Sequence, residues 1–298
     1  MTFPRLRLSA SAVGVLILGA CAGTPPPTTV KVLPAPGAPS PEAASAQLDR
    51  AEADLRAGRY DRALEGFSAV HRMNEANARA RIGLAEAHLA LGNPDMAIRI
   101  FDGWEAPAAY RATVAQDKGI SWLLTGENDK ARSLLTEAVG TDMGLWRAWT
   151  ALAMLHDRSK DWDQADLCFK QASMANPRSG AVFNNHGMSL MLRGRVDDAI
   201  REFRQAIQIE PGLKTALDNL ALATALEGRY EMAMAAVPSD KLPATMNNAG
   251  FAALSRGDLV RAEDLFTQAI KSSPRHFSQA EENLRWLHYI KSNADPSS

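Results

Sequence analysis

Eight side chains are thiols or imidazoles, which titrate nearest neutral pH and serve as nucleophiles, general bases or metal ligands. They are two cysteines and six histidines: Cys21, Cys168, His71, His88, His156, His186, His276 and His288. The histidines do not occur in the H-E-x-x-H spacing of zinc enzymes, and the cysteines form no C-x-x-C pair. A phosphate-binding glycine loop and a G-x-S-x-G nucleophile turn are also missing from the sequence. We therefore expect no catalytic site, no metal and no cofactor. An enzyme whose site follows no known motif is the alternative class.

Cys21 stands where its thiol could be modified. Arg5 and Arg7 give a positive start, and an apolar stretch ending at residues 13–18 follows. This stretch is shorter than the roughly 20 apolar residues that span a bilayer, and the order of charge and apolar run is typical of a signal peptide. The next residues, Leu18-Gly19-Ala20-Cys21, resemble the bacterial lipobox. That resemblance implies a signal peptide over residues 1–20 and acylation of Cys21 after cleavage; a chance cysteine behind an ordinary signal peptide is the alternative.

Residues 21–44 are predicted to be a tether. Prolines recur in it, among Ala, Gly, Thr and Ser: Pro25, Pro26, Pro27, Pro34, Pro36, Pro39 and Pro41. At about 3.1 Å per residue, its Pro-rich residues 22–41 reach roughly 60 Å, or they are an inert spacer. The lipobox is followed by Ala22 and not by the Asp of inner-membrane lipoproteins. The resemblance therefore implies anchoring in the outer membrane through acyl chains, with the body facing the periplasm.

A 34-residue period governs the rest of the chain. Gly58, Gly92, Gly126, Gly194 and Gly228 are separated by 34 or 68 residues, Lys160 fills the gap, and Gly257 follows after 29. Alanine stands five residues after each position: Ala63, Ala97, Ala131, Ala165, Ala199, Ala233 and Ala262. Large apolar residues stand nine after it: Phe67, Phe101, Leu135, Phe169, Phe203, Val237 and Phe266. Small ones stand seven before it: Ala51, Ala85, Gly119, Ala153, Gly187, Ala221 and Gly250.

This period predicts paired helices with a tight turn at each glycine, because a left-handed backbone is least costly without a Cβ. The pattern resembles the tetratricopeptide-repeat (TPR) family, whose unit is a helix–turn–helix. The resemblance implies an all-α, right-handed solenoid of about seven units over residues 45–275, with a capping helix in residues 276–298. Lys160 should adopt the turn at a cost of about 1 kcal/mol. Residues 238–243 should form an irregular join.

One face of the first helices is predicted to hold a protein or peptide segment. It carries apolar residues in units four to seven: Met154, Met188, Met191, Leu222 and Phe251. Three amides, Asn185, Asn219 and Asn248, border them and could bond a peptide backbone. Glu52 and Glu86 occupy the matching position in units one and two, where they would repel an apolar segment. The alternatives are that the apolar residues are core and that the amides bond within the fold. Of the tryptophans, Trp149 is expected in the core and Trp146 on the surface.

The charge balance disfavours a nucleic-acid partner. The chain carries 33 Lys and Arg against 34 Asp and Glu, without a basic run. The lipobox, tether and repeats together resemble the TadD family of Tad (Flp) pilus assembly lipoproteins. The segments NNHGMSLMLRGRVDDAI, DNLALATALEGRYEMAM and NNAGFAALSRGDLVRAE carry that resemblance. It implies a membrane-anchored scaffold that assists assembly of a pilus or its outer-membrane secretin. The alternative is a scaffold for outer-membrane protein insertion or for regulation of peptidoglycan enzymes.

Overall fold

The computed structural model describes residues 40–274 and 276–294. Within these ranges the chain forms fifteen α-helices and two short 3-10 helices, and no strand. The predicted all-α class is confirmed. The described residues divide into two compact units, which meet between Pro177 and Arg178 in the sequence and are described separately below. Cys21, the signal peptide and the tether up to residue 39 lie outside the described residues.

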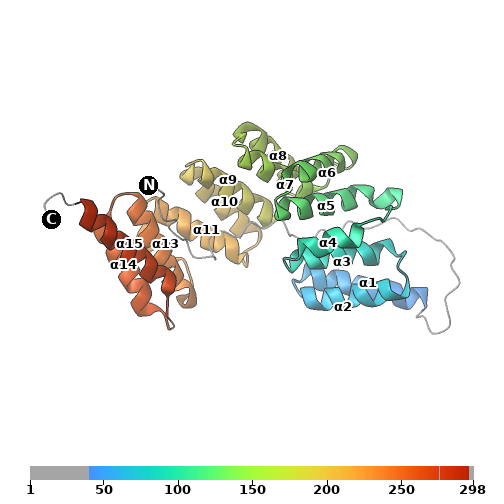
Figure 1. The fold of residues 1–298 in the computed structure, drawn as a ribbon, viewed down its shortest axis with the longest axis horizontal. Coiled ribbons are helices and arrows are strands. Elements are labelled where there is room, and N and C mark those ends of the chain that lie inside the picture. The colour runs from blue at the N-terminus through green and yellow to red at the C-terminus, as the bar shows by residue number, and fades with distance from the viewer. Residues whose placement is uncertain (1–39, 275, 295–298) are drawn as a thin grey trace. The chain divides into compact units, whose positions relative to one another are not determined.

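The N-terminal unit contains four helical pairs (Figure 1). Its helices are α1 (Pro41–Arg56), α2 (Tyr60–Met73), α3 (Ala78–Ala90), α4 (Pro94–Phe101), η2 (Ala108–Tyr110), α5 (Arg111–Thr125), α6 (Asn128–Thr141), α7 (Trp146–Arg158) and α8 (Trp162–Ala175). Each first helix, α1, α3, α5 or α7, packs on the second helix that follows it, and α1, α3 and α5 also pack on the next first helix. The first helices therefore form one continuous layer of this unit.

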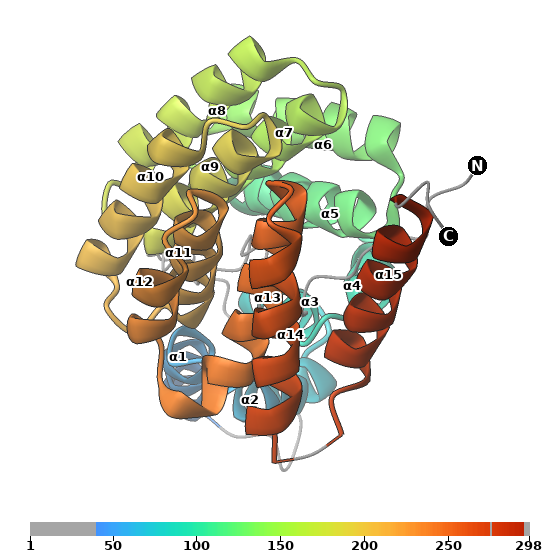
Figure 2. The same cartoon turned by 90° about the vertical axis from the view of Figure 1, so that its left-hand side faces the viewer.

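The C-terminal unit repeats the same arrangement. Its helices are α9 (Gly180–Leu192), α10 (Val196–Ile209), α11 (Lys214–Leu226), α12 (Tyr230–Ala235), η3 (Ser239–Lys241), α13 (Leu242–Ser255), α14 (Leu259–Ser272) and α15 (Ser278–Ala294). Figure 2 shows α13, α14 and α15 lying side by side. Helix α15 covers the last pair, as expected of a capping helix.

All seven predicted turn positions have a left-handed backbone. The φ angle is positive at Gly58, Gly92, Gly126, Lys160, Gly194, Gly228 and Gly257. Lys160, at φ 59°, is the only non-glycine residue with this conformation in the described part of the chain. A side chain there pays the steric penalty between its Cβ and the backbone that glycine avoids.

We expect Lys160→Gly to stabilise the protein by about 1 kcal/mol, because glycine relieves that penalty. Lys160→Ala keeps a Cβ and should change stability little. Urea denaturation followed by circular dichroism measures both changes. Equal stability of the glycine and alanine variants would contradict the assignment of strain to this position.

The predicted small and large positions pack against each other. A Cβ on Gly187 would lie 2.6 Å from the ring of Phe203, and one on Gly250 would lie 2.7 Å from the ring of Phe266. The alanines five residues after each turn are all fully buried. Small residues therefore let the two helices of a pair approach, and the large residue fills the space between them. This arrangement buries the apolar core at close packing density.

Three boundaries differ from the predictions. Helix α1 begins at Pro41, inside the predicted tether, because Ser40 caps Ala43 N at 3.2 Å and proline suits the first helical position. Helix α4 ends after eight residues, and Gly103 (φ 63°) follows in a loop that the repeat pattern did not indicate. Helix α12 has only six residues and η3 lies in the predicted irregular join, but α13 begins at Leu242, before the predicted end of that join.

Candidate binding surface on the first helices

The apolar residues predicted for the partner surface lie at different depths. Met188 and Leu222 are 9% and 3% exposed, and Met188 belongs to a core cluster with Phe203. Met154, Met191 and Phe251 are half-buried and pack on the edges of core clusters. Their remaining exposed surface is what this face offers to an apolar partner. Whether a partner uses it stays a prediction.

The predicted asparagines take part in a buried set of side-chain amides. Asn185, Asn219 and Asn248 are 3%, 0% and 6% exposed. The amide nitrogen of Asn219 on α11 donates to Asn184 Oδ1 on α9 at 2.9 Å. Asn283 on α15 donates in the same way to Asn247 Oδ1 on α13 at 2.9 Å. These bonds tie neighbouring helices together, so the amides have a structural role in the C-terminal unit.

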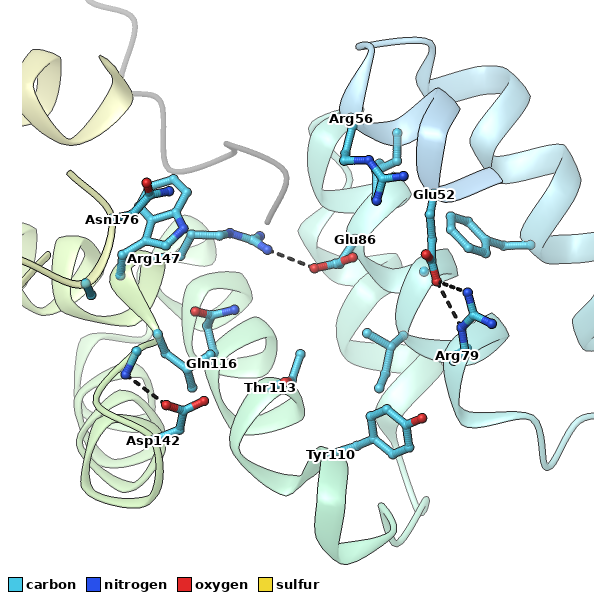
Figure 3. Close-up of a pocket in the computed structure, with 18 residues that line it drawn as sticks. Glu52, Arg56, Arg79, Glu86, Tyr110, Thr113, Gln116, Asp142, Arg147 and Asn176 are labelled. Atoms are coloured by element: carbon cyan, nitrogen blue, oxygen red, sulfur yellow. Dashed lines mark hydrogen bonds and ion pairs between the residues drawn. The ribbon is translucent and has the colours of Figure 1, made fainter. Parts of the chain in front are cut away.

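A cavity of about 360 Å³ opens on the first-helix layer of the N-terminal unit (Figure 3). Residues from α1, α3, α5 and α7 line it, together with η2 and the turn before α7. Apolar surface comes from Leu55, Phe67, Ile82, Tyr110 and Trp146. Its polar lining includes Glu52, Arg56, Arg79, Glu86, Thr113, Gln116, Asp142, Arg147 and Asn176. It lies in units one to four, whereas the sequence pointed to units four to seven.

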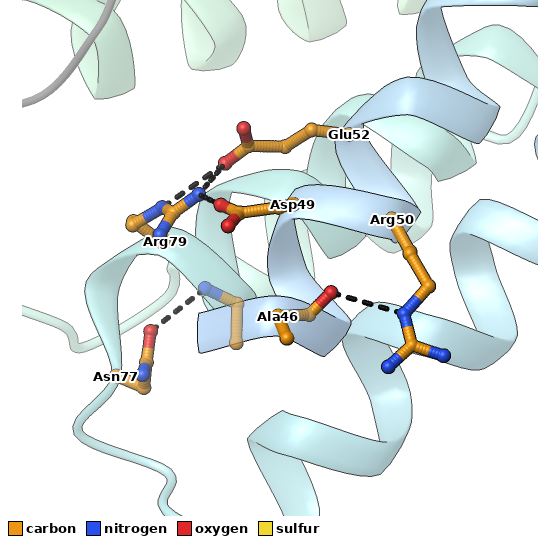
Figure 4. Close-up of polar contacts among 7 residues, drawn as sticks. Ala46, Asp49, Arg50, Glu52, Asn77 and Arg79 are labelled. Atoms are coloured by element: carbon orange, nitrogen blue, oxygen red, sulfur yellow. Dashed lines mark hydrogen bonds and ion pairs between the residues drawn. The ribbon is translucent and has the colours of Figure 1, made fainter. Parts of the chain in front are cut away.

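On one wall, Arg79 joins α3 to α1 (Figure 4). Its Nε and Nη2 donate to Glu52 Oε1 at 3.0 and 2.7 Å, and Nη2 also donates to Asp49 Oδ1 at 2.8 Å. A guanidinium that bonds two carboxylates is held in one orientation. The Glu52 side chain that was expected to repel a partner is therefore fixed by an arginine of the next first helix.

On the opposite wall, Arg147 of α7 lies between two carboxylates. Its Nη1 is 3.0 Å from Glu86 Oε1 on α3 and 3.5 Å from Asp117 Oδ1 on α5. The side chains of Arg147 and Asp117 are 4% and 0% exposed. Gln116 donates to the same Asp117 oxygen at 3.2 Å and accepts from Ala148 N at 3.2 Å. One buried cation thus joins the first helices of three successive pairs.

One guanidinium cannot fully compensate the negative charges of two neighbouring carboxylates. Burial, reinforced by the charge of Asp117, raises the pKa of Glu86 to about 7 against the pull of Arg147. Burial also raises the pKa of Asp117, while Arg147 and Gln116 oppose that rise. Because Glu86 binds its proton more tightly in the folded chain, folding stability falls as pH rises from about 4.5 to about 7.

Glu86→Gln should therefore stabilise the protein above that range. At about pH 8 we expect a gain of about 1–3 kcal/mol, since glutamine mimics the protonated acid, and little difference at about pH 5. Thermal unfolding at the two pH values measures the effect. Glu137→Gln, at an exposed position of α6, serves as the control and should show no such pH dependence. An unchanged pH profile in the Glu86 variant would refute the role of Glu86.

The structure contradicts the expected place of Trp146, whereas Trp149 packs on the edge of a core cluster. Trp146, expected on the surface, is 3% exposed and lines the cavity, because it starts α7 facing the layer of first helices. Trp149 is half-buried, and its indole nitrogen donates to Met143 O at 3.0 Å. Arg79 and Arg147 were missed altogether. The signal for them was the pair Glu52 and Glu86 at the same repeat position, since carboxylates on a packed face need cationic partners.

The described residues contain no group of three or more side chains that could hold a metal ion. Cys168 is buried, and burial raises the pKa of its thiol to about 11, so it is not a ready nucleophile. No helix in the described ranges is long and apolar enough to cross a membrane.

Two stretches of the chain, residues 54–112 and 150–214, match sequence profiles described as tetratricopeptide repeat. The chain therefore contains tetratricopeptide repeats in these two stretches. Among curated sequences, it is similar to the peroxisomal targeting signal receptor of Saccharomyces cerevisiae, with 30% identity over 82 residues. That match covers 28% of this chain and 13% of the receptor. The TPR chain thus spans a small part of the curated relatives that it matches.

Solved TPR structures share the fold at low identity. The human IFIT1 dimer with m7Gppp-AAAA is 16% identical, with a TM-score of 0.63 over 85% of this chain and 64% of that one. A chain of the APC/C hetero-tetramer Cut9-Hcn1 is 14% identical, with a TM-score of 0.59 over 85% and 50% of the two chains. TPR arrays are protein-interaction scaffolds that bind proteins or peptides on an extended surface.

Proposed function

We propose that the chain is a lipid-anchored scaffold of the bacterial envelope that holds a segment of a partner protein on its first helices. The observation that carries this proposal is the cavity on the first-helix layer, with walls from four successive first helices. A bound segment would contact several pairs at once, as suits a stacked-repeat surface. The half-buried Met154, Met191 and Phe251 extend the available apolar surface within each unit.

The membrane side of the proposal rests on the sequence around Cys21. The box Leu18-Gly19-Ala20-Cys21, Ala22 after it and the prolines that follow support acylation and an outer-membrane anchor facing the periplasm. Two or more acyl chains give stable anchoring, at about 0.8 kcal/mol per buried CH₂ group. The likeness to TadD-family lipoproteins supports a role in assembling a Tad-type pilus or its secretin.

Cys21→Ser should release the protein from the membrane fraction, because serine offers no thiol for acylation. Fractionation and gel mobility of the variant measure this, with Cys168→Ser as the matched control that stays membrane-bound. A Cys21→Ser protein that remains in the membrane with unchanged mobility would refute the anchor.

A separate measurement tests the proposed role in pilus assembly. In cells that carry Cys21→Ser as the only copy, multimers of the pilus secretin should fail to form in the outer membrane. Normal secretin multimers in cells lacking the whole protein would exclude the pilus role and leave another envelope machine as the client.

A further inference from the structure

The charged side chains that line the cavity of the N-terminal unit are balanced. Three are carboxylates, Glu52, Glu86 and Asp142, and three are guanidinium groups, Arg56, Arg79 and Arg147. Two pairs neutralise each other within the fold, because Arg79 bonds Glu52 at 2.7 Å and Arg147 bonds Glu86 at 3.0 Å. Asp142 accepts a hydrogen bond from Gly144 N, and both Asp142 and Arg56 are exposed to water. Of these six lining groups, none offers an unpaired, buried charge to a partner.

We propose that this cavity takes an uncharged, apolar stretch of the partner segment, and that this binding takes up a proton at Glu86. The inference rests on the proposed function, because it specifies the segment that the scaffold holds and the pH at which it is held. A charged residue placed in the cavity would lose its water and find the paired charges of the lining already bonded, so it is costly to bury there. Leu55, Ile82 and Tyr110 give an uncharged stretch its apolar contacts.

Glu86 is the lining acid that shares its cation with a fully buried carboxyl group. Arg147 lies 3.5 Å from Asp117 on α5, whose side chain is 0% exposed, so one cation serves two acids. The Glu86 side chain is 19% exposed, against 4% for Arg147, so water in the cavity reaches mainly the carboxylate. This water supplies the compensation that Arg147 does not. A segment that fills the cavity removes the water and favours the protonated carboxyl group.

The groups around Glu86 set the pH range of this coupling. The charged groups facing Glu86 are Glu52 from α1, Asp117 from α5 and Arg147 from α7. Burial and the charge of Asp117 raise the pKa of Glu86 to about 7 against the pull of Arg147. A bound segment raises that pKa further, because it removes the remaining water. Binding therefore takes up a proton, and the affinity falls as pH rises, by up to about tenfold between about pH 6 and about pH 8.

Three dansyl-labelled, capped peptides test the charge of the occupant on the full, detergent-solubilised chain, against a blank of the same detergent. Their sequences are GLQLG, GLKLG and GLELG, so only the central charge differs. At about pH 7, dansyl fluorescence should show the glutamine peptide binding about tenfold more tightly than either charged peptide, because neither charge finds an unpaired partner in the cavity. Tighter binding of the lysine or the glutamate peptide, equal affinities, or no binding of any peptide would overturn the proposal.

The pH dependence of the glutamine peptide assigns the proton. Its affinity for the native chain should fall by about five- to tenfold from about pH 6 to about pH 8. Glu86→Gln should bind it equally at both pH values, because glutamine takes up no proton, while Glu137→Gln, at an exposed position, keeps the dependence. A change of under about twofold in the native chain, or a dependence that persists in Glu86→Gln, would overturn the coupling. Failure here is separable from failure of the scaffold, because crosslinking in cells detects partner capture whatever the charge of the segment.

Discussion

Arg147→Met is expected to destabilise the N-terminal unit by about 3–5 kcal/mol at neutral pH. The change leaves the buried Asp117 and the partly buried Glu86 without their shared cation, and breaking a buried ion pair by removing one partner costs about this much. The loss should shrink at about pH 5, where the two acids take up protons at little cost because their pKa values are raised. Hydrogen exchange of the amides in α3, α5 and α7 measures the loss where it occurs.

The matched control is a triple variant in which all three side chains of the cluster are uncharged. In the triple variant Glu86→Gln, Asp117→Asn and Arg147→Met, no uncompensated charge is left, so most of the stability should return. If Arg147→Met alone retains the exchange protection of the native chain, the three side chains do not form a linked charge cluster.

Phe203→Ala is expected to cost about 3–5 kcal/mol in the C-terminal unit. Phe203 is fully buried, and its ring lies directly over Gly187, which has no side chain to fill the space that the ring leaves. Exchange protection should fall in α9, α10 and α11, because stability in stacked repeats is set by each repeat and its immediate neighbours.

Leu192→Ala provides the comparison for this change in the same unit. Leu192 is 69% exposed, and its truncation should cost less than about 0.5 kcal/mol. A loss of under about 1 kcal/mol in Phe203→Ala would contradict the packing of the large residue against the small one.

The sequence predicts the fold well at positions whose residue type recurs at the same place in each repeat. The turn at Lys160 and the contact between Gly187 and Phe203 follow from fixed spacings of 34 and 16 residues. The shortening of α4 escaped prediction because Gly103 and the loop up to Pro107 lie outside the repeat pattern. The backbone preferences of single residues decide where such a helix ends. The 34-residue repeat pattern does not contain this information, because it describes only what the repeats share.

The candidate site was harder to predict because it depends on contacts between repeats. Arg147 and Glu86 are 61 residues apart and meet only when α3, α5 and α7 stack. Helical periodicity places Met188 and Met191 on one face, but the neighbouring helix decides that Met188 is buried and Met191 only partly so. Periodicity gives the direction of a side chain, and packing gives its depth. The anchor at Cys21 lies outside the described residues and stays a prediction.

Site-specific photocrosslinking in cells tests the scaffold most directly. A photoreactive amino acid would replace Tyr110 at the cavity, Met191 on α9, or Leu167, which is 53% exposed on the second helix α8. We predict that an envelope protein crosslinks from Tyr110 or Met191 and not from Leu167. Crosslinks from Leu167 alone, or from none of the three positions in a chain that is correctly folded and localised, would contradict a scaffold that binds through its first helices.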